Sequence, residues 1–250
     1  MAGRTALITG AAGFTGRGIA QVLAERGAAI VLNDIDPERA QAFAEELEAG
    51  GTRVVAAPFD VTDYDAVITG VARAEAELAP IDILVNNVGM PGTPNKHVLF
   101  EESDPADWRP WIDINIYGSL NCLRAVLAGM CERGWGRVIQ ISSAMAARGL
   151  PNREALLGGS KAGIEGALRS IAMEVVDRGV TINSLALGLL ENATTHADPE
   201  IVQATLARVP MGRFLEPREV GAAVAYLASE EAGFVTAQVH HLNGGSFHGR

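Results

Sequence analysis

The chain has 250 residues, of which 48% are hydrophobic and 20% charged, a composition typical of a globular domain with a substantial core and not of a disordered chain. Acidic residues outnumber basic ones by 30 to 20, and the net charge of −10 argues against nucleic acid or an anionic membrane surface as the main partner. No apolar run approaches the roughly 18 residues that span a bilayer.

Short apolar segments alternate with segments of helical periodicity along the whole chain. The apolar segments are hydrophobic from end to end, as expected of strands that are covered on both faces. Predicted strands cover residues 6–8, 29–33, 53–57, 81–85, 137–141, 180–186 and 239–242. The first two predicted helices end at Gly27 and Gly50. The others cover residues 63–79, 105–133, 154–178 and 217–230. A loop and a further helix fill residues 187–209. The helix over 105–133 is expected to kink at Pro110.

The alternation predicts an α/β fold with a doubly wound parallel sheet of about seven strands. No linker, repeat or low-complexity tract interrupts it, so residues 1–250 are predicted as one domain. In such a sheet, ligands bind beyond the carboxyl ends of the strands at the switch point of the strand order. Polar or glycine-rich positions follow five of the predicted strands: the turn over 10–16, Asp34, Asp60, Asn87 and the pair 142–143.

The turn between the first strand and the first helix holds Gly10, Gly13 and Gly16 at three-residue intervals. Such a turn lets a phosphate approach the backbone, and the helix N-terminus adds free N–H groups and a positive dipole end. Taken alone, the triplet also fits an ordinary tight turn. Asp34 ends the second strand about twenty residues further on, where a carboxylate accepts ribose hydroxyls and repels a 2′-phosphate. We therefore expect NAD in preference to NADP. The alternative role for Asp34 is to cap the next helix, for which Asp36 is the better candidate.

Two cysteines, Cys122 and Cys131, lie nine residues apart on one predicted helix. This spacing places them on roughly opposite faces, so they cannot pair with each other. The sequence shows no cluster of metal ligands, and no metal site is predicted. The chain enters a predicted strand within a few residues of its start, so no signal peptide is expected. A reducing, cytoplasmic location is the simplest interpretation.

The chain resembles the short-chain dehydrogenase/reductase family along nearly its whole length. The matching segments are 9–16 (TGAAGFTG), 60–61 (DV), 86–89 (NNVG), Asn115, 141–143 (ISS), 161–163 (KAG), 182–183 (IN), 210–213 (PMGR) and 243–245 (NGG). The resemblance implies a Rossmann-type subunit that binds a nicotinamide dinucleotide. It also implies a homo-oligomer, usually a tetramer, built on the two long helices and the C-terminal helix and strand, with a dimer as the alternative.

The resemblance assigns cofactor contacts residue by residue. It implies a pyrophosphate turn, a ribose acid, an adenine contact, a segment under the ribose and a stretch that holds the nicotinamide carboxamide. The pyrophosphate turn corresponds to Gly10, Gly13, Phe14, Thr15 and Gly16, and the ribose acid to Asp34 with Ile35. The adenine contact corresponds to Asp60 and Val61, and the segment under the ribose to Asn87, Val88 and Gly89. The stretch at the carboxamide corresponds to Leu187, Gly188, Leu190 and Asn192. The family usually has glycine at Phe14 and proline at Leu187, but backbone groups make those contacts, so binding is expected to survive.

The catalytic positions match only in part. The resemblance implies that Asn115 holds an ordered water, that Ser143 polarises a substrate carbonyl and that Lys161 binds the nicotinamide ribose. The alternative role for Ser143 is structural, with its hydroxyl capping the loop at the end of the strand. The family's tyrosine should lie four residues before Lys161, where this chain has Leu157. Leucine can neither donate nor accept the proton that carbonyl reduction or alcohol oxidation requires.

Several groups are candidates to replace the phenol. The three tyrosines are poorly placed by spacing: Tyr64 opens a helix far from the site, Tyr117 leaves a different face of the helix from Asn115, and Tyr226 is expected on a packed face. Glu154 would need a raised pKa to act as an acid, and His97 lies in a variable loop. We favour Lys161 itself, which can pass a proton through the ribose hydroxyl or through a water held by Asn115.

Three functions fit this pattern. The first is an NAD(H)-dependent oxidoreductase with a non-standard proton donor, acting on a small, largely apolar carbonyl or alcohol, or on an enol- or imine-like substrate. The second is a catalytically silent NAD-binding or scaffold homologue. The third is a lyase or isomerase that uses the same pocket without redox chemistry. Substrate contacts are expected in the loops 90–102, 144–153 and 188–209, which carry several apolar residues.

Overall fold

The computed structural model describes residues 1–90, 98–149, 154–191 and 199–248. Seven strands form one sheet in the order β3-β2-β1-β4-β5-β6-β7, and every neighbouring pair is parallel. This confirms the predicted doubly wound sheet, with the switch point between β1 and β4. The strands are β1 (Thr5–Ile8), β2 (Ala29–Leu32), β3 (Val54–Ala56), β4 (Ile83–Asn86), β5 (Gly136–Ser143), β6 (Val180–Leu187) and β7 (Val239–Leu242).

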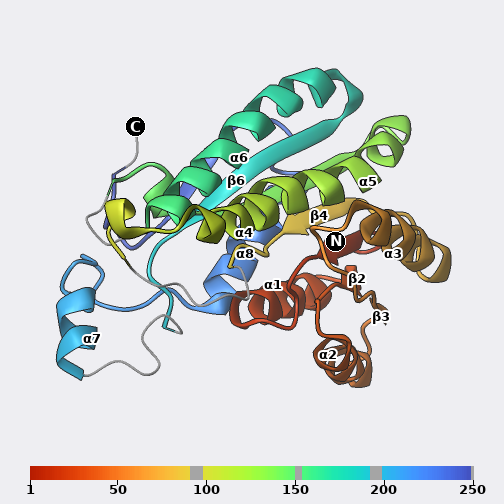
Figure 1. Ribbon diagram of the computed structural model, residues 1–250. Coiled ribbons are helices and arrows are strands. Elements are labelled where there is room, and N and C mark those ends of the chain that lie inside the picture. Colours follow the sequence, from red (N-terminus) through yellow and green to blue (C-terminus); the bar gives the residue numbers. More distant parts are fainter. Residues whose placement is uncertain (91–97, 150–153, 192–198, 249–250) are drawn as a thin grey trace.

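Helices cover both faces of the sheet (Figure 1). The face that carries Ile8 packs against α1, α2 and α8, and the opposite face, which carries Leu7, packs against α3, α5 and α6. Because neighbouring strand residues point to opposite faces and both faces are covered, the central strands are apolar at most positions. The helices are α1 (Phe14–Glu25), α2 (Pro37–Ala49), α3 (Tyr64–Glu77), α4 (Arg109–Ile112), α5 (Gly118–Glu132), α6 (Ala155–Val175), α7 (Pro199–Leu206) and α8 (Pro217–Leu227).

The long helical stretch predicted to run to Arg133 is present without a break over 109–132, but its irregularity does not lie at Pro110, where a kink was expected. Pro110 lies in the first turn of α4, where its missing N–H costs nothing. The irregularity comes later, as a π-helical segment over Asp113–Tyr117 that separates α4 from α5. The side-chain amide of Asn115 donates to the Trp111 carbonyl, so a side chain occupies an acceptor of the helical hydrogen-bond ladder. Insertions of this kind are a known cause of irregular helix geometry.

Strand β5 is longer than predicted and carries Ser142 and Ser143 inside the sheet. Both residues pair with β6, and Ser143 lies opposite Leu187. Both cysteines are free, with Cys122 buried in α5, as their spacing predicts. Within the described ranges, no helix is both long and apolar enough to cross a bilayer.

Thr9 stabilises the switch point of the sheet, where β1 and β4 end side by side. Its hydroxyl accepts the backbone N–H groups of Asn87 (2.9 Å) and Val88 (3.2 Å). The side chain of Asn87 donates in turn to the carbonyls of Thr9 (2.9 Å) and Gly10 (3.2 Å). The ends of β1 and β4 are therefore held together by polar groups around one buried threonine.

Replacing Thr9 by valine is expected to lower the free energy of unfolding by about 1–3 kcal/mol, because two N–H groups lose their acceptor. Thr181 in β6 is the matched control: it is also buried, but its hydroxyl has no partner among the described residues. Thr181→Val should be neutral or stabilising. Urea unfolding of both variants measures the difference. Equal losses in the two variants would contradict this role of Thr9.

Candidate active site

The glycine turn is closely packed. Gly10 has a positive φ of 60°, which favours glycine. A Cβ on Gly16 would lie 2.3 Å from the Gly10 carbonyl oxygen and 2.7 Å from the Ala11 Cα, so no side chain fits there. The turn therefore requires glycine at its first and last positions for steric reasons.

Helix α1 begins at this turn without a side-chain cap. Gly13 is its N-cap residue, no side chain bonds to its first amides, and its first turn carries no acidic residue. In contrast, α2 and α3 are capped by Asp36 and Asp63. A free N-terminus of a twelve-residue helix fits a phosphate. The predicted pyrophosphate contacts Phe14 and Thr15 lie in this first turn, and Phe14 is partly exposed.

Asp34 lies just beyond β2, at the same edge of the sheet as the glycine turn. It is buried, and one carboxylate oxygen accepts the N–H of Asp36 at 3.2 Å. Asp36 caps α2 by accepting the N–H groups of Glu38 and Arg39, as the sequence predicts. The capping role is thus filled by Asp36, which leaves Asp34 compatible with the predicted ribose contact. Ile35 between them is largely exposed.

Asp60 and Val61, predicted at the adenine, have structural partners of their own. Asp60 accepts both the N–H and the hydroxyl of Thr62 at 2.8 Å. Val61 is buried, and its carbonyl accepts the side-chain amide of Asn121. Sequence reasoning missed Arg39, which reaches from α2 to donate to the Ala12 carbonyl in the glycine turn at 3.0 Å. No sequence motif marks this arginine.

Lys161, Asn115 and Gly89 converge at the carboxyl ends of β4 and β5. The Lys161 Nζ is buried and donates to the Ile141 carbonyl at 2.7 Å. The Asn115 amide donates to the Gly89 carbonyl at 3.2 Å. A Cβ on Gly89 would lie 2.4 Å from the Lys161 Nζ and 3.1 Å from the Asn115 Oδ1. Glycine at this position therefore leaves the space that both side chains need beside the loop after β4.

The Asn115 Oδ1 is buried and has no hydrogen-bond partner among the described residues. A buried acceptor of this kind normally binds a polar group, so the site fits the ordered water that the resemblance implies. Burial lowers the pKa of Lys161 to about 8, an effect that the nearby Glu165 carboxylate opposes. A lysine with this pKa can exchange its proton near neutral pH.

Ser143 ends β5, and its hydroxyl accepts the N–H of Met145 at 3.2 Å. The capping role is therefore present in the structure. This contact uses only a lone pair of the serine oxygen and does not engage the hydroxyl hydrogen. Ser143 thus remains compatible with the predicted carbonyl contact.

Leu157 lies half-buried in the first turn of α6, one turn before Lys161. The three tyrosines lie at exposed positions in α3, the π segment and α8, with 44% of Tyr64, 57% of Tyr117 and 49% of Tyr226 accessible. The expectation that Tyr226 is packed is wrong, because the neighbouring Val224 and Ala225 fill that helix's buried face. Glu154 lies directly before α6, and His97 is outside the described residues.

The predicted nicotinamide end lies where β6 leaves the sheet. Leu187 is buried, and the Gly188 N–H donates to the Leu242 carbonyl at 2.9 Å. A Cβ on Gly188 would lie 2.7 Å from the Asn243 Cα, so this segment is packed against the end of β7. Leu190 forms a bridge with Leu215, and Asn192 lies outside the described residues.

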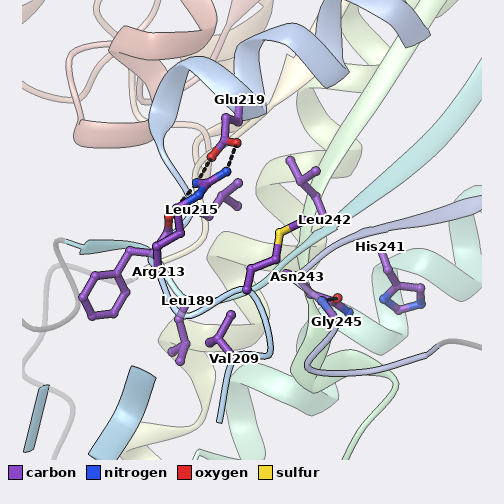
Figure 2. Close-up of a pocket in the computed structure, with 12 residues that line it drawn as sticks. Leu189, Val209, Arg213, Leu215, Glu219, His241, Leu242, Asn243 and Gly245 are labelled. Atoms are coloured by element: carbon purple, nitrogen blue, oxygen red, sulfur yellow. Dashed lines mark hydrogen bonds and ion pairs between the residues drawn. The ribbon is translucent and has the colours of Figure 1, made fainter. Parts of the chain in front are cut away.

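A pocket of about 290 Å³ lies beyond the carboxyl ends of β6 and β7 (Figure 2). Leu189, Val209, Met211 and Leu215 line it with apolar side chains. Arg213 pairs with Glu219 on its wall, with hydrogen bonds of 2.8 and 2.6 Å. None of the predicted catalytic residues lines this pocket, but Leu189 and Val209 belong to the predicted substrate loop 188–209.

Comparisons with known proteins identify the family of the chain. A family model described as "Enoyl-(Acyl carrier protein) reductase" matches residues 10–246. The chain is 38% identical over 247 residues to nodulation protein G of Azospirillum brasilense, covering 98% of both chains.

Two solved structures share the fold closely. A gluconate 5-dehydrogenase from Burkholderia cenocepacia, in complex with NADP and tartrate, has a TM-score of 0.91 and 31% identity, covering 98% of this chain and 96% of that one. A 3-oxoacyl-[acyl-carrier protein] reductase with bound NAD from Brucella melitensis has a TM-score of 0.89 and 31% identity, covering 98% and 91%. The sequence and the fold thus match along almost their full length, and the chain belongs to the short-chain dehydrogenase/reductase family of oxidoreductases.

Proposed function

We propose that the protein is an NAD(H)-dependent oxidoreductase in which Lys161 and a water at Asn115 replace the missing phenol. The observation that carries this proposal is the position of two groups beside Gly89: the Lys161 Nζ and the Asn115 Oδ1, which has no hydrogen-bond partner among the described residues. The glycine turn, the uncapped α1 and Asp34 lie at the same edge of the sheet and would hold the dinucleotide. A bound nicotinamide would supply or accept the hydride.

The proton is the part of the reaction that this chain must handle with its own residues. In the reductive direction, the Lys161 Nζ–H bond breaks as the water takes that proton. The water, which donates to the Asn115 Oδ1, passes one of its own protons to the negatively charged oxygen of the product. Lys161 is left neutral and recovers a proton from solvent. A pKa of about 8 for Lys161 makes both protonation states accessible near neutral pH.

The substrate that we propose is a small, largely apolar carbonyl or alcohol, or an enol- or imine-like compound. The described parts of the loops 90–102, 144–153 and 188–209 carry apolar side chains such as Leu99, Met145 and Leu189. The two solved relatives named above are a gluconate 5-dehydrogenase and a 3-oxoacyl-[acyl-carrier protein] reductase, so the family accommodates different substrates. Leu157 is expected to contribute a further apolar surface one turn from Lys161.

We also propose a homo-oligomer, with a tetramer favoured over a dimer. In support, β7 is an edge strand, and Met173 and Val176 at the end of α6 and Tyr226 in α8 leave apolar surface exposed. The acidic net charge supports a protein that binds neither nucleic acid nor membrane. A cytoplasmic location without a resident metal completes the proposal.

Asp34 is expected to select NADH over NADPH by at least tenfold, because its carboxylate would repel a 2′-phosphate. Asp34→Ala should weaken NADH binding by about tenfold or more, the worth of hydrogen bonds to a charged group, and should weaken NADPH binding much less. Asp36→Ala is the control, since it removes the cap of α2 but leaves the ratio of the two affinities unchanged. Titrations followed by nicotinamide fluorescence measure both ratios. Equal binding of the two cofactors by the unmodified protein would contradict the assignment.

The Leu157→Tyr variant tests whether the protein is an active enzyme with a different proton donor or a homologue without catalytic activity. If the protein works through Lys161 and water, a phenol at this position intrudes on the substrate space and should lower the existing activity. Leu157→Phe is the matched control, because it has nearly the same volume without the hydroxyl and should cause a similar loss. Cofactor oxidation with a panel of small ketones and 3-oxoacyl thioesters measures the effect. Reductase activity that appears only in Leu157→Tyr would instead favour a silent homologue.

A further inference from the structure

Helix α6 buries two charged residues on the same face, one turn apart. Lys161 and Glu165 are only 4% and 6% exposed, and residues four positions apart on a helix are neighbours. Both side chains bond to consecutive residues of β5. The Lys161 Nζ donates to the Ile141 carbonyl, and Glu165 accepts a short hydrogen bond of 2.5 Å from the Ser142 hydroxyl.

Burying the Glu165 carboxylate costs free energy unless an opposite charge or hydrogen bonds compensate. The hydrogen bond from Ser142 satisfies one oxygen but supplies no countercharge. Lys161 does supply one, and Glu165 is the charged group that raises the pKa of this lysine against the effect of burial. The other described groups around the Lys161 ammonium are neutral: the Ile141 carbonyl from β5 accepts its hydrogen bond, and Gly89 from the loop after β4 and Asn115 from the π segment lie nearby.

The arrangement has a consequence for a site without a phenol. A fully buried lysine with no neighbouring anion would lose its proton more readily. Less of its ammonium form would then be present to donate a proton. With Leu157 in the preceding turn, that position of α6 offers no phenol to share the proton. The carboxylate behind Lys161, on the side away from Leu157, is therefore placed to keep the ammonium form available.

We propose that Glu165, held by Ser142, is a positioning residue that maintains the charge and orientation of Lys161 for proton transfer. This inference rests on the proposed role of Lys161 as the proton donor. Glu165 itself takes no proton in the step, so its effect is electrostatic. The hydrogen bond from Ser142 holds one carboxylate oxygen of Glu165 and so limits the rotation of this side chain.

The sequence offers an unusually direct test, because the chain contains only two lysines, Lys96 and Lys161. In protein labelled with ¹³C at lysine Cε, a Lys96→Arg background leaves one signal, and its chemical shift reports the charge of Lys161. A titration from about pH 6 to pH 11 brackets both the shifted and the ordinary lysine pKa. We expect a midpoint near 8. In Glu165→Gln, which can still accept from Ser142, the midpoint should fall by about one pH unit or more.

Glu174→Gln is the matched control, because Glu174 lies on the same helix but is exposed; its midpoint should equal that of the background protein. If Glu165→Gln does not fold, Glu165→Asp draws the charge back by one methylene and should give a smaller decrease. An unchanged midpoint in the folded variant overturns the inference. The titration needs neither cofactor nor substrate, so failure to bind NADH would overturn the proposed function while leaving this result intact.

Discussion

The seven strands run parallel and are covered on both faces, and the rest of the molecule depends on this constraint. Parallel strands end at one edge, so everything that follows a strand is brought to the same side of the sheet. The glycine turn after β1, Asp34 after β2, Gly89 after β4 and Ser143 at the end of β5 meet there for this reason. The burial of the central strands also excludes water from the sheet, so buried polar groups at this edge must find partners among themselves or in a ligand.

Two kinds of polar group occupy that edge. Some form hydrogen bonds that hold the backbone, as Thr9, Asn87 and Asp60 do. Others retain capacity for a ligand: the first amides of α1, the Asn115 Oδ1 and the Lys161 ammonium. The groups that shape the glycine turn lie on β1, β4 and α1, whereas the altered position, Leu157, lies on α6.

Much of this arrangement could be predicted from the sequence. Apolar segments of strand length determined the sheet, and the three-residue glycine spacing located the turn, because both signals depend on local chemistry. The π segment at Asn115 was missed since its cause is a side chain competing for a backbone carbonyl four residues earlier, which a proline-based rule does not consider. The contact from Arg39 to Ala12 and the pairing of Glu165 with Ser142 could not be foreseen, because each joins segments whose separation depends on the packed fold.

The central claim is that Lys161 lies against the nicotinamide end of a bound dinucleotide and is the group that handles the proton. The most direct measurement is a crystal structure of the full chain with NADH. The account predicts the diphosphate at the N-terminus of α1, a nicotinamide ribose hydroxyl within hydrogen-bonding distance of the Lys161 Nζ, and a water on the Asn115 Oδ1. A dinucleotide that makes no contact with Lys161 would contradict this claim. So would a structure in which the Leu157 side chain lies between Lys161 and the nicotinamide.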